Sequence, residues 1–363
     1  MIILKKNREH GTLQRAILDI GTNSLRSEKI ITFIFGNQIH YLDHLAPLAS
    51  LLEIPLVVTE LEIETLAKKF YPNLQVIYFP PSEVAERVVS HFDVVISCFP
   101  KDLFDSIFYI AEELHQKQLI NVWCPHGNSD KGHASPFMEG LSKERWAFVY
   151  GKKMIDFLKE KGAWNQLEEV FILGNYRYEY FKKHEDFYHS ILPFNRKGKT
   201  LLYAPTWNDG ENLSSYNTVS TFLIDSVPNH WNLIIKPHPH LQVDASSTKE
   251  NVIFLNHFPP IYPLLEMSDA YLGDMSSVGY DFLTFRRPQF FFNLQKRDPN
   301  TDRGLYLTQC GTILDPNKDI FTQIESIDHT PFIKIQDQIY NEVFGKDPTI
   351  DAFTKTISQA ALH

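Results

Sequence analysis

Short apolar runs alternate along the chain with longer stretches in which apolar residues recur at helical spacing. KIITFIF (29–35) and DVVISCF (93–99) are such runs, and ELEIETLAKKFY (60–71) is such a helical stretch. Continuous apolar runs of about five to seven residues, separated by helices, are typical of parallel strands buried on both faces. We therefore expect strands in the first half of the chain at 29–35, 54–58, 74–79, 93–99, 119–124, 146–151 and 170–174.

The same pattern restarts after a polar link, with the boundary between residues 175 and 197. It predicts a second set of strands at 200–207, 231–237, 252–256, 270–274, 288–293 and 311–315. The organisation that follows is two doubly wound α/β domains, with ligands at the carboxyl ends of the strands that face the cleft between them. The predicted parts are an N-terminal segment (1–28), a first domain (29–180), a second domain (195–345) and a C-terminal helical tail (346–363).

Composition narrows the class of protein. A chain of 363 residues with 43% hydrophobic and 22% charged residues is typical of a soluble globular protein. Its net charge of −9 argues against a general nucleic-acid binder, which usually carries a basic face. The three cysteines are far apart and form no CxxC pair, and no apolar run approaches the roughly 18 residues that span a bilayer. We expect a cytoplasmic protein, since the N-terminus also lacks the pattern of a secretory signal.

Two predicted strands end in residues that can do chemistry or bind phosphate. His126 and Gly127 follow the strand at 119–124; the glycine permits a tight turn, and the histidine could act as a general base. Thr206 follows the strand at 200–207 and could donate to a phosphate. Each has a plainer interpretation, as a turn histidine or an ordinary strand exit.

The stretch WNLIIKPHPHL (231–241) ends a strand with a cation and two imidazoles. Lys236 offers a point charge for phosphate, and His238 can donate to an anion or carry a proton. The two prolines deny backbone donors to the sheet and hold the segment extended. His238 and His240 also form an HxH pair, but no carboxylate or cysteine accompanies them at metal-ligand spacing.

A fourth stretch, SDAYLGDMSSVGYDFLTF (268–285), is a strand followed by an expected amphipathic helix. The strand should end at Asp274, so that Ser276 and Ser277 present hydroxyls and backbone N–H groups to an anion at the start of the helix. Asp281, one turn further on, could accept a hydrogen bond from a sugar or nucleotide hydroxyl. An ordinary helix cap is the alternative.

Several familiar sites are absent from the sequence. We find no Walker lysine loop, no GxGxxG after a strand, no GxSxG elbow and no HExxH. A convincing DxD pair, by which many transferases hold a divalent ion, is missing too. A nucleotide diphosphate would therefore be held by a helix N-terminus and by basic residues; downstream, Lys296, Arg297 and Arg303 gather in a loop that could also be a solvated charge run.

Taken in order, these motifs resemble the CDP-glycerol glycerophosphotransferase family, the poly(glycerol phosphate) primases and polymerases of teichoic acid synthesis. The resemblance covers roughly residues 119 to 315. It is carried by these residues: His126, Gly127 and Lys131; Pro205, Thr206 and Trp207; Lys236, His238 and Pro239; Ser268, Asp269, Asp274, Ser276, Ser277, Asp281 and Phe282; Arg303 and Gly304.

The resemblance implies a GT-B fold, in which two Rossmann-like domains face a central cleft, and a CDP-activated polyol donor bound mainly by the second domain. It implies that His126 is the base for the acceptor hydroxyl and that His238 acts with it in catalysis. No metal or other cofactor is expected, and peripheral attachment to the inner face of the membrane is implied by the family. The donor-binding residues it implies are Lys236, Asp274, Ser276, Ser277, Asp281, Thr206, Arg303, Gly127 and Lys131.

Three motifs depart from the family pattern, at four positions in all. Met275 stands where the family usually has tyrosine between the aspartate and the serines, and Gly273 replaces a threonine before that aspartate. Asn208 and Asn128 replace an arginine and a threonine that are common in the family. These changes leave the phosphate-handling groups in place but bear on the identity of the polyol and the acceptor.

The function we expect is transfer of glycerol phosphate, or a related polyol phosphate, from a CDP-activated donor to a hydroxyl of a cell-surface glycan or lipid-linked acceptor, without a metal. Lys236 and His238 would offset charge as the donor's phosphate bond breaks. The alternatives are a GT-B glycosyltransferase that uses a nucleotide sugar, a GT-B sugar-nucleotide epimerase, and a GT-B module that binds without turnover.

Overall fold

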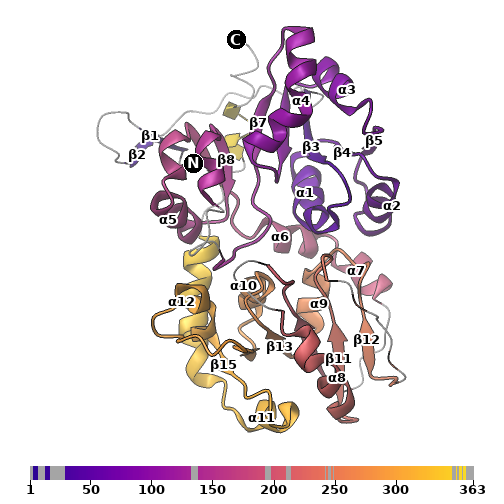
Figure 1. Cartoon of the computed structure of the whole chain (residues 1–363), viewed down its shortest axis with the longest axis vertical. Helices are drawn as coiled ribbons and strands as arrows, with labels where there is room; N and C mark the ends of the chain where they lie inside the picture. The colour runs from indigo at the N-terminus through magenta and orange to yellow at the C-terminus, as the bar shows by residue number, and fades with distance from the viewer. Residues whose placement is uncertain are drawn as a thin grey trace. The chain divides into compact units, whose positions relative to one another are not determined.

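The computed structural model describes residues 3–6, 13–16, 29–131, 138–192, 198–209, 214–241, 243, 247, 249–345, 349, 351–353 and 355–356. Most of the predicted N-terminal segment (1–28) and much of the predicted tail (346–363) lie outside these residues. The chain divides into two compact units (Figure 1). Unit 1 comprises residues 1–126, 137–183 and 342–363, and unit 2 comprises residues 127–136 and 184–341.

Unit 1 is built on a nine-stranded sheet of order β2-β1-β9-β8-β7-β6-β3-β4-β5. From β5 to β9 every neighbouring pair is parallel, whereas β1 pairs antiparallel with both β2 and β9. The strands are β1 (Ile3–Lys6), β2 (Leu13–Ala16), β3 (Ile30–Ile34), β4 (Leu56–Val58), β5 (Val76–Tyr78), β6 (Val94–Ser97), β7 (Ile120–Trp123), β8 (Trp146–Val149) and β9 (Glu169–Ile172).

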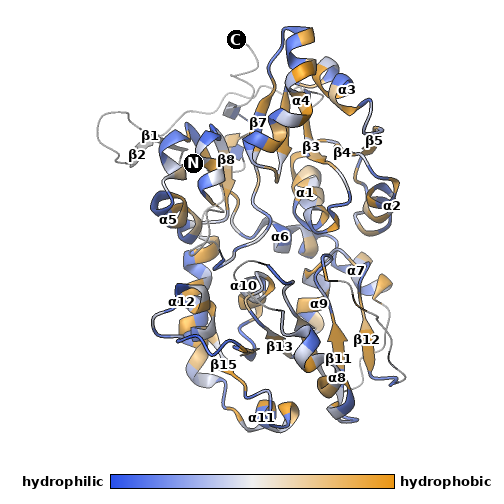
Figure 2. Ribbon diagram, viewed as in Figure 1, coloured by the Kyte–Doolittle hydropathy of each residue, from blue (hydrophilic) through white to orange (hydrophobic). Residues whose placement is uncertain are grey.

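Helices connect these strands, as parallel pairing requires. They are α1 (Ile39–Leu52), α2 (Leu61–Phe70), α3 (Val84–His91), α4 (Lys101–His115), η2 (Met138–Lys143), α5 (Lys152–Glu160), η3 (Ala163–Gln166) and α6 (Tyr176–Lys183). Helices α3 and α4 share one core cluster with β3, β4 and β6, in which Phe104 and Phe108 of α4 are fully buried. The parallel strands of unit 1 are mostly hydrophobic in Figure 2, as expected for strands that are buried on both faces and whose sequences lack alternation.

Unit 2 has a six-stranded, all-parallel sheet of order β12-β11-β10-β13-β14-β15. Its strands are β10 (Lys199–Ala204), β11 (Trp231–Ile235), β12 (Val252–Phe254), β13 (Ala270–Gly273), β14 (Gln289–Phe291) and β15 (Thr312–Ile313). In chain order this is 3-2-1-4-5-6, the doubly wound arrangement, whose order reverses between β10 and β13.

Short helices complete unit 2 and the end of the chain. They are α7 (Glu185–Ile191), α8 (Tyr216–Ser226), α9 (Tyr262–Met267), α10 (Val278–Phe282), η4 (Leu283–Phe285), η5 (Arg303–Cys310), α11 (Ile320–Ser326), η6 (Thr330–Phe332) and α12 (Ile333–Phe344). Helices α8 and α11 pack against one face of the sheet through Val219, Leu223, Ile320 and Phe321. No helix among the described residues is long and apolar enough to cross a membrane.

Every strand predicted from an apolar run is confirmed. Two local features of the structure differ from what the sequence predicted. The antiparallel hairpin β1–β2 was not predicted, and the amphipathic helix expected after Ser277 is only the five-residue α10, followed by the 3-10 turn η4.

Candidate active site

The site begins at the point in unit 2 where the strand order reverses. Strands β10 and β13 are neighbours there, with Ala204 paired with Gly273, so the residues that follow them leave the sheet side by side. The backbone N–H of Thr206 donates to Oδ1 of Asp274 at 2.7 Å and ties the two strand ends together. In doubly wound sheets such a reversal forms a crevice at the carboxyl ends of the strands, where ligands bind.

The carboxylate of Asp274 accepts hydrogen bonds from other residues of unit 2. Its Oδ2 accepts hydrogen bonds from the backbone N–H of Ser215 at 3.0 Å and from the Ser215 hydroxyl at 2.8 Å, and the residue is only 7% exposed. Burial raises the pKa of Asp274, although these hydrogen bonds and the charge of Lys131 oppose the change. We therefore assign Asp274 to holding β10, β13 and the start of α8 together.

Lys131 reaches the same strand end from a distant part of the sequence. Its Nζ lies 2.5 Å from Oγ1 of Thr206 and 2.6 Å from Oδ2 of Asp209. It also lies 6.0 Å from the ring centroid of Trp207. Lys131 thus carries a positive charge to the end of β10, where Asp209 balances it.

The preceding residue fixes this loop on unit 2. Asp130 is buried, accepts a hydrogen bond from the Tyr280 hydroxyl at 2.5 Å, and accepts the backbone N–H of Leu307 at 3.2 Å. Asp130 and Asp209 were not singled out in the sequence. The signal for Asp130 was its place directly before Lys131 in the same motif.

Lys236 and His238 follow the adjacent strand, β11. The backbone N–H of Lys236 donates to the Tyr203 carbonyl at 2.9 Å, so its position relative to β10 is fixed. The His238 ring stacks on Trp207, with centroids 5.9 Å apart, and its Nδ1 accepts the backbone N–H of His240 at 3.2 Å. A lysine and an imidazole therefore stand, half-buried, beside the Thr206 strand end.

Ser276 and Ser277 follow β13 and are half-buried. The Ser277 side chain makes no capping hydrogen bond to α10. Gly127 lies against it with a φ of +125°, and a Cβ atom there would sit 2.7 Å from the Ser277 hydroxyl oxygen. Gly127 is thus required both by its backbone conformation and by this close approach.

Asp281 and Arg303 lie differently from these residues. Asp281 is 3% exposed and accepts a hydrogen bond from the Tyr262 hydroxyl at 3.3 Å, so it belongs to the interior of unit 2. Arg303 is exposed at the start of η5. The structure therefore groups seven of the predicted donor-binding residues at the ends of β10, β11 and β13. It places Asp281 in the interior, and Arg303 directly before Gly304, which lines a pocket with Asp274 and Ser276.

His126 belongs to unit 1 and follows β7. Its ring packs against two side chains at the start of α1, with centroid distances of 5.6 Å to His40 and 4.9 Å to Tyr41. The Tyr150 hydroxyl donates to the carbonyl of Pro125 at 3.1 Å and fixes the backbone next to His126. Burial, with the nearby Cys98 thiol, raises the pKa of Tyr41, so this phenol stays protonated.

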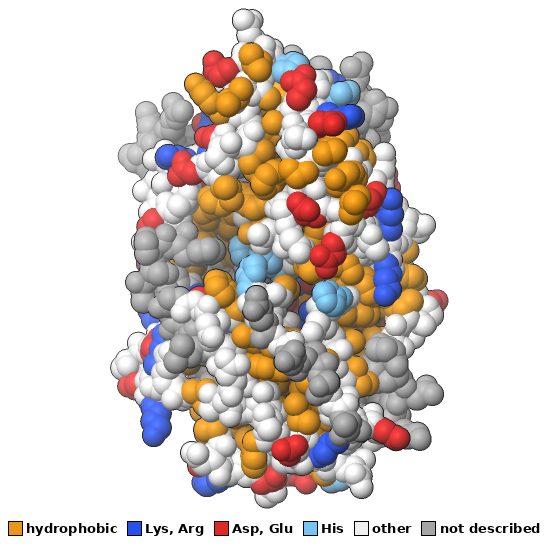
Figure 3. Space-filling model, turned by 45° about the vertical axis from the view of Figure 1, so that its right-hand side comes forward, with side chains coloured by type: hydrophobic (Ala, Val, Ile, Leu, Met, Phe, Trp, Pro, Cys, Tyr) orange, Lys and Arg blue, Asp and Glu red, His pale blue; other side chains and the backbone are white. Residues whose placement is uncertain are grey.

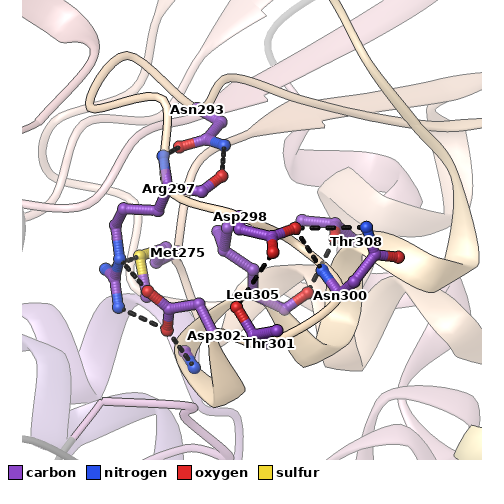
Figure 4. Close-up of polar contacts among 10 residues, drawn as sticks. Met275, Asn293, Arg297, Asp298, Asn300, Thr301, Asp302, Leu305 and Thr308 are labelled. Carbon is purple, nitrogen blue, oxygen red and sulfur yellow. Dashed lines mark hydrogen bonds and ion pairs between the residues drawn. The ribbon is translucent and has the colours of Figure 1, made fainter.

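A small pocket opens beside the end of β13. The sequence drew attention to Met275 and Arg297 but did not predict that they line a pocket. The pocket is lined in part by Met275, Asn293, Gln295 and Arg297. Figure 4 shows the Arg297 guanidinium paired with both oxygens of Asp302 and donating to the Met275 sulfur at 2.9 Å. Arg297 is therefore not a solvated charge. Its guanidinium contacts the side chain of Met275, and Met275 is one of the positions that depart from the family pattern.

Comparison with known proteins supplies the family. The family model described as CDP-Glycerol:Poly(glycerophosphate) glycerophosphotransferase matches residues 139–343, more than half of the chain. The chain belongs to this glycerophosphotransferase family. The resemblance inferred from the strand-end motifs is thereby confirmed.

Curated relatives of this glycerophosphotransferase-family chain are teichoic acid enzymes. The teichoic acid glycerol-phosphate primase of Bacillus subtilis is 27% identical over 67% of this chain and 68% of its own length. The ribitol-phosphate primase of Bacillus spizizenii is 25% identical over 45% and 46%, and the poly(glycerol phosphate) polymerase of Staphylococcus epidermidis is 28% identical over 35% and 19%. The chain thus spans less than half the length of the latter two.

Solved structures show the same fold. The wall teichoic acid polymerase TagF matches with a TM-score of 0.62 over 93% of this chain and 89% of that one, at 15% identity. The UDP-GlcNAc 2-epimerase of Neisseria meningitidis matches with a TM-score of 0.52 over 92% and 99%, at 14% identity. The predicted GT-B fold, with two parallel-sheet α/β domains, is confirmed.

Proposed function

We propose that the chain transfers glycerol phosphate, or a related polyol phosphate, from a CDP-activated donor to a hydroxyl of a glycan or lipid-linked acceptor. The observation that carries this proposal is the convergence of Lys131, Lys236, His238, Ser276 and Ser277 at neighbouring strand ends of unit 2. Cations, an imidazole and hydroxyls are the groups that a diphosphate needs. The family, and a TagF structure soaked with CDPG, support a CDP-glycerol-type donor.

In the proposed reaction the acceptor oxygen attacks the phosphorus that bears the polyol. A new P–O bond forms, the bond from this phosphorus to the bridging oxygen of the diphosphate breaks, and CMP leaves. His126 takes the proton of the attacking hydroxyl, while Lys236 and His238 offset the negative charge that develops on the leaving phosphate. Protein side chains supply all the charge in this proposal, so no metal is required.

Calorimetric titration with CDP, CMP, UDP, GDP and CDP-glycerol, with and without EDTA, tests the donor. We expect CDP and CDP-glycerol to bind most tightly, with affinities that EDTA leaves unchanged. The Ser276→Ala/Ser277→Ala double variant should weaken CDP binding roughly tenfold or more, because two hydrogen bonds to a charged group are lost. Ser226→Ala, at the end of α8 in the same unit, is the control.

The other possible outcomes of this titration would each point to a different function. Preference for UDP or GDP would replace the proposal with a sugar transferase or an epimerase, the class to which a structural neighbour belongs. Binding that disappears with EDTA would overturn metal independence. Absence of any nucleotide binding would favour a module without turnover.

We also propose that the protein associates peripherally with membranes, through helix α4. Leu103, Ile110 and Leu114 form one stripe along this helix, and they are 43%, 73% and 76% exposed, with Tyr109 beside them at 60%. Figure 3 shows hydrophobic side chains at the surface near the top, where Figure 1 places α4. A stripe of large exposed apolar side chains marks an interaction surface, and a bilayer is where a lipid-linked acceptor would be found.

Vesicle co-sedimentation tests this association. We expect the protein to sediment with phosphatidylglycerol and phosphatidylethanolamine vesicles, and the Ile110→Glu/Leu114→Glu variant to stay in the supernatant. Leu61→Glu, which alters a 60% exposed leucine on α2, should behave like the parent protein. Equal sedimentation of the double variant and the parent would count against α4 as the contact.

A further inference from the structure

Three side chains of types that bind metal ions meet in unit 2, away from the strand ends described above. Glu185 and His189 are four residues apart on α7, so they lie on the same face of that helix. Glu266 comes from the last turn of α9. One ligand atom from each of the three lies within 4.8 Å of the others, and His189 Nε2 is 3.0 Å from Glu266 Oε2.

This cluster differs from the other histidine–glutamate pairs among the described residues. His115 pairs with Glu86 at 2.8 Å, and His230 pairs with Glu325 at 2.6 Å. Within the part of the chain that the structure describes, neither pair has a third side chain of a metal-binding type within the same reach. The HxH pair considered in the sequence, His238 and His240, also gains no third ligand among the residues that the structure places.

The surroundings suit a cation. The His189 side chain is 46% exposed and that of Glu266 is 28% exposed, so an ion can enter and water can fill its remaining positions. Glu266 is held in place because the Arg287 guanidinium donates to the carbonyls of Glu266 and Ser268, at 2.5 and 2.6 Å. The end of α9 carries the negative pole of the helix, which favours a positive charge there.

We propose that Glu185, His189 and Glu266 form a binding site for a divalent cation, with Zn²⁺ as the best match. One imidazole nitrogen and two carboxylate oxygens, with an open fourth position, are a ligand set that Zn²⁺ accepts. Helix α7 is the first element of unit 2 after the chain leaves α6. The ion would link α7 to α9 and stabilise unit 2 at the point where the chain returns to it after α6.

Titration of ZnCl₂ into EDTA-treated, dialysed protein tests the site. We expect one Zn²⁺ per chain in the parent protein. His189→Ala and Glu185→Gln should each weaken binding by at least about tenfold, because loss of a ligand costs at least as much as loss of a group that orients one. His230→Ala removes a histidine from a pair without a second carboxylate, and should bind Zn²⁺ like the parent protein.

Thermal unfolding provides an independent readout. Zn²⁺ should raise the melting temperature of the parent protein and of His230→Ala but not that of His189→Ala, while circular dichroism in EDTA verifies that each variant is folded. The proposal is overturned if the parent protein binds no Zn²⁺, or if His189→Ala binds it with unchanged affinity. It is also overturned if binding is lost on changing His238 and His240 and kept on changing His189.

Discussion

Replacing His126 with alanine should lower the turnover number roughly 100- to 10,000-fold while changing CDP affinity by less than about twofold, the signature of a lost general base. The residue belongs to unit 1, whereas the cations and serines that we assign to the donor belong to unit 2. Its loss should therefore leave donor binding intact and remove proton transfer. Single-turnover kinetics and calorimetry on the same preparation measure the two quantities.

Two further variants make this result specific. His91→Ala removes an exposed histidine of α3 in the same unit and should retain the parent rate. Tyr41→Phe keeps the ring that packs against His126 and should retain most of the activity. A turnover number in His126→Ala close to that of the parent protein would falsify the assignment of the base.

Replacing Glu144 with glutamine should stabilise unit 1 by up to about 3 kcal/mol above pH 7, since each unit of pKa shift corresponds to about 1.4 kcal/mol. Glu144 is 1% exposed. Its carboxylate accepts hydrogen bonds from the Asn121 side chain, at 2.9 Å, and from the backbone N–H of Lys101. Burial outweighs these bonds and raises the pKa of Glu144 from 4.5 to about 7.

The pH dependence follows from this direction of shift. Below pH 4.5 the group is protonated in both folded and unfolded chains and costs nothing. Between pH 4.5 and about 7 the unfolded chain releases the proton while the folded chain keeps it, so stability falls as pH rises. Above pH 7 both forms are ionised and the full cost of the buried charge remains.

Differential scanning calorimetry from pH 4 to pH 8 measures this effect. The parent protein should lose stability over that range, and Glu144→Gln should lose less, so that its melting temperature is several degrees higher at pH 8. Glu113→Gln, which alters an exposed carboxyl group on α4, controls for the general loss of one negative charge. Identical pH profiles for Glu144→Gln and the parent protein would contradict the prediction.

The sheets could be predicted from the sequence because strands buried on both faces leave continuous apolar runs. Such runs mark every parallel strand from β3 to β15, including the short β15. The hairpin β1–β2 gave no such signal, since ILKK and LQRA are short and half polar.

The strand-end residues of the site could also be predicted, but their partners could not. The sequence motif predicted Lys131 as a site residue. Asp209, which balances the charge of Lys131, is 78 residues away in the sequence and was not predicted. Asp281 was expected to face a ligand, but it is buried and accepts a hydrogen bond from Tyr262, which no local pattern connects to it. Contacts of this kind arise from the packing of distant segments and leave no periodic signal.

The division of the chain into interleaved units bears on how it folds during synthesis. Residues from the end of the chain complete unit 1: Thr349 accepts the backbone N–H of Ile172 at 2.7 Å, and Phe353 packs on Phe148 and Phe171. At about 5–20 residues per second, the ribosome needs on the order of ten seconds to make the intervening part of unit 2. During that interval Phe148 of β8 and Phe171 of β9 lack their contacts with Phe353. Unit 1, although its synthesis starts first, is therefore the last of the two units to complete its packing.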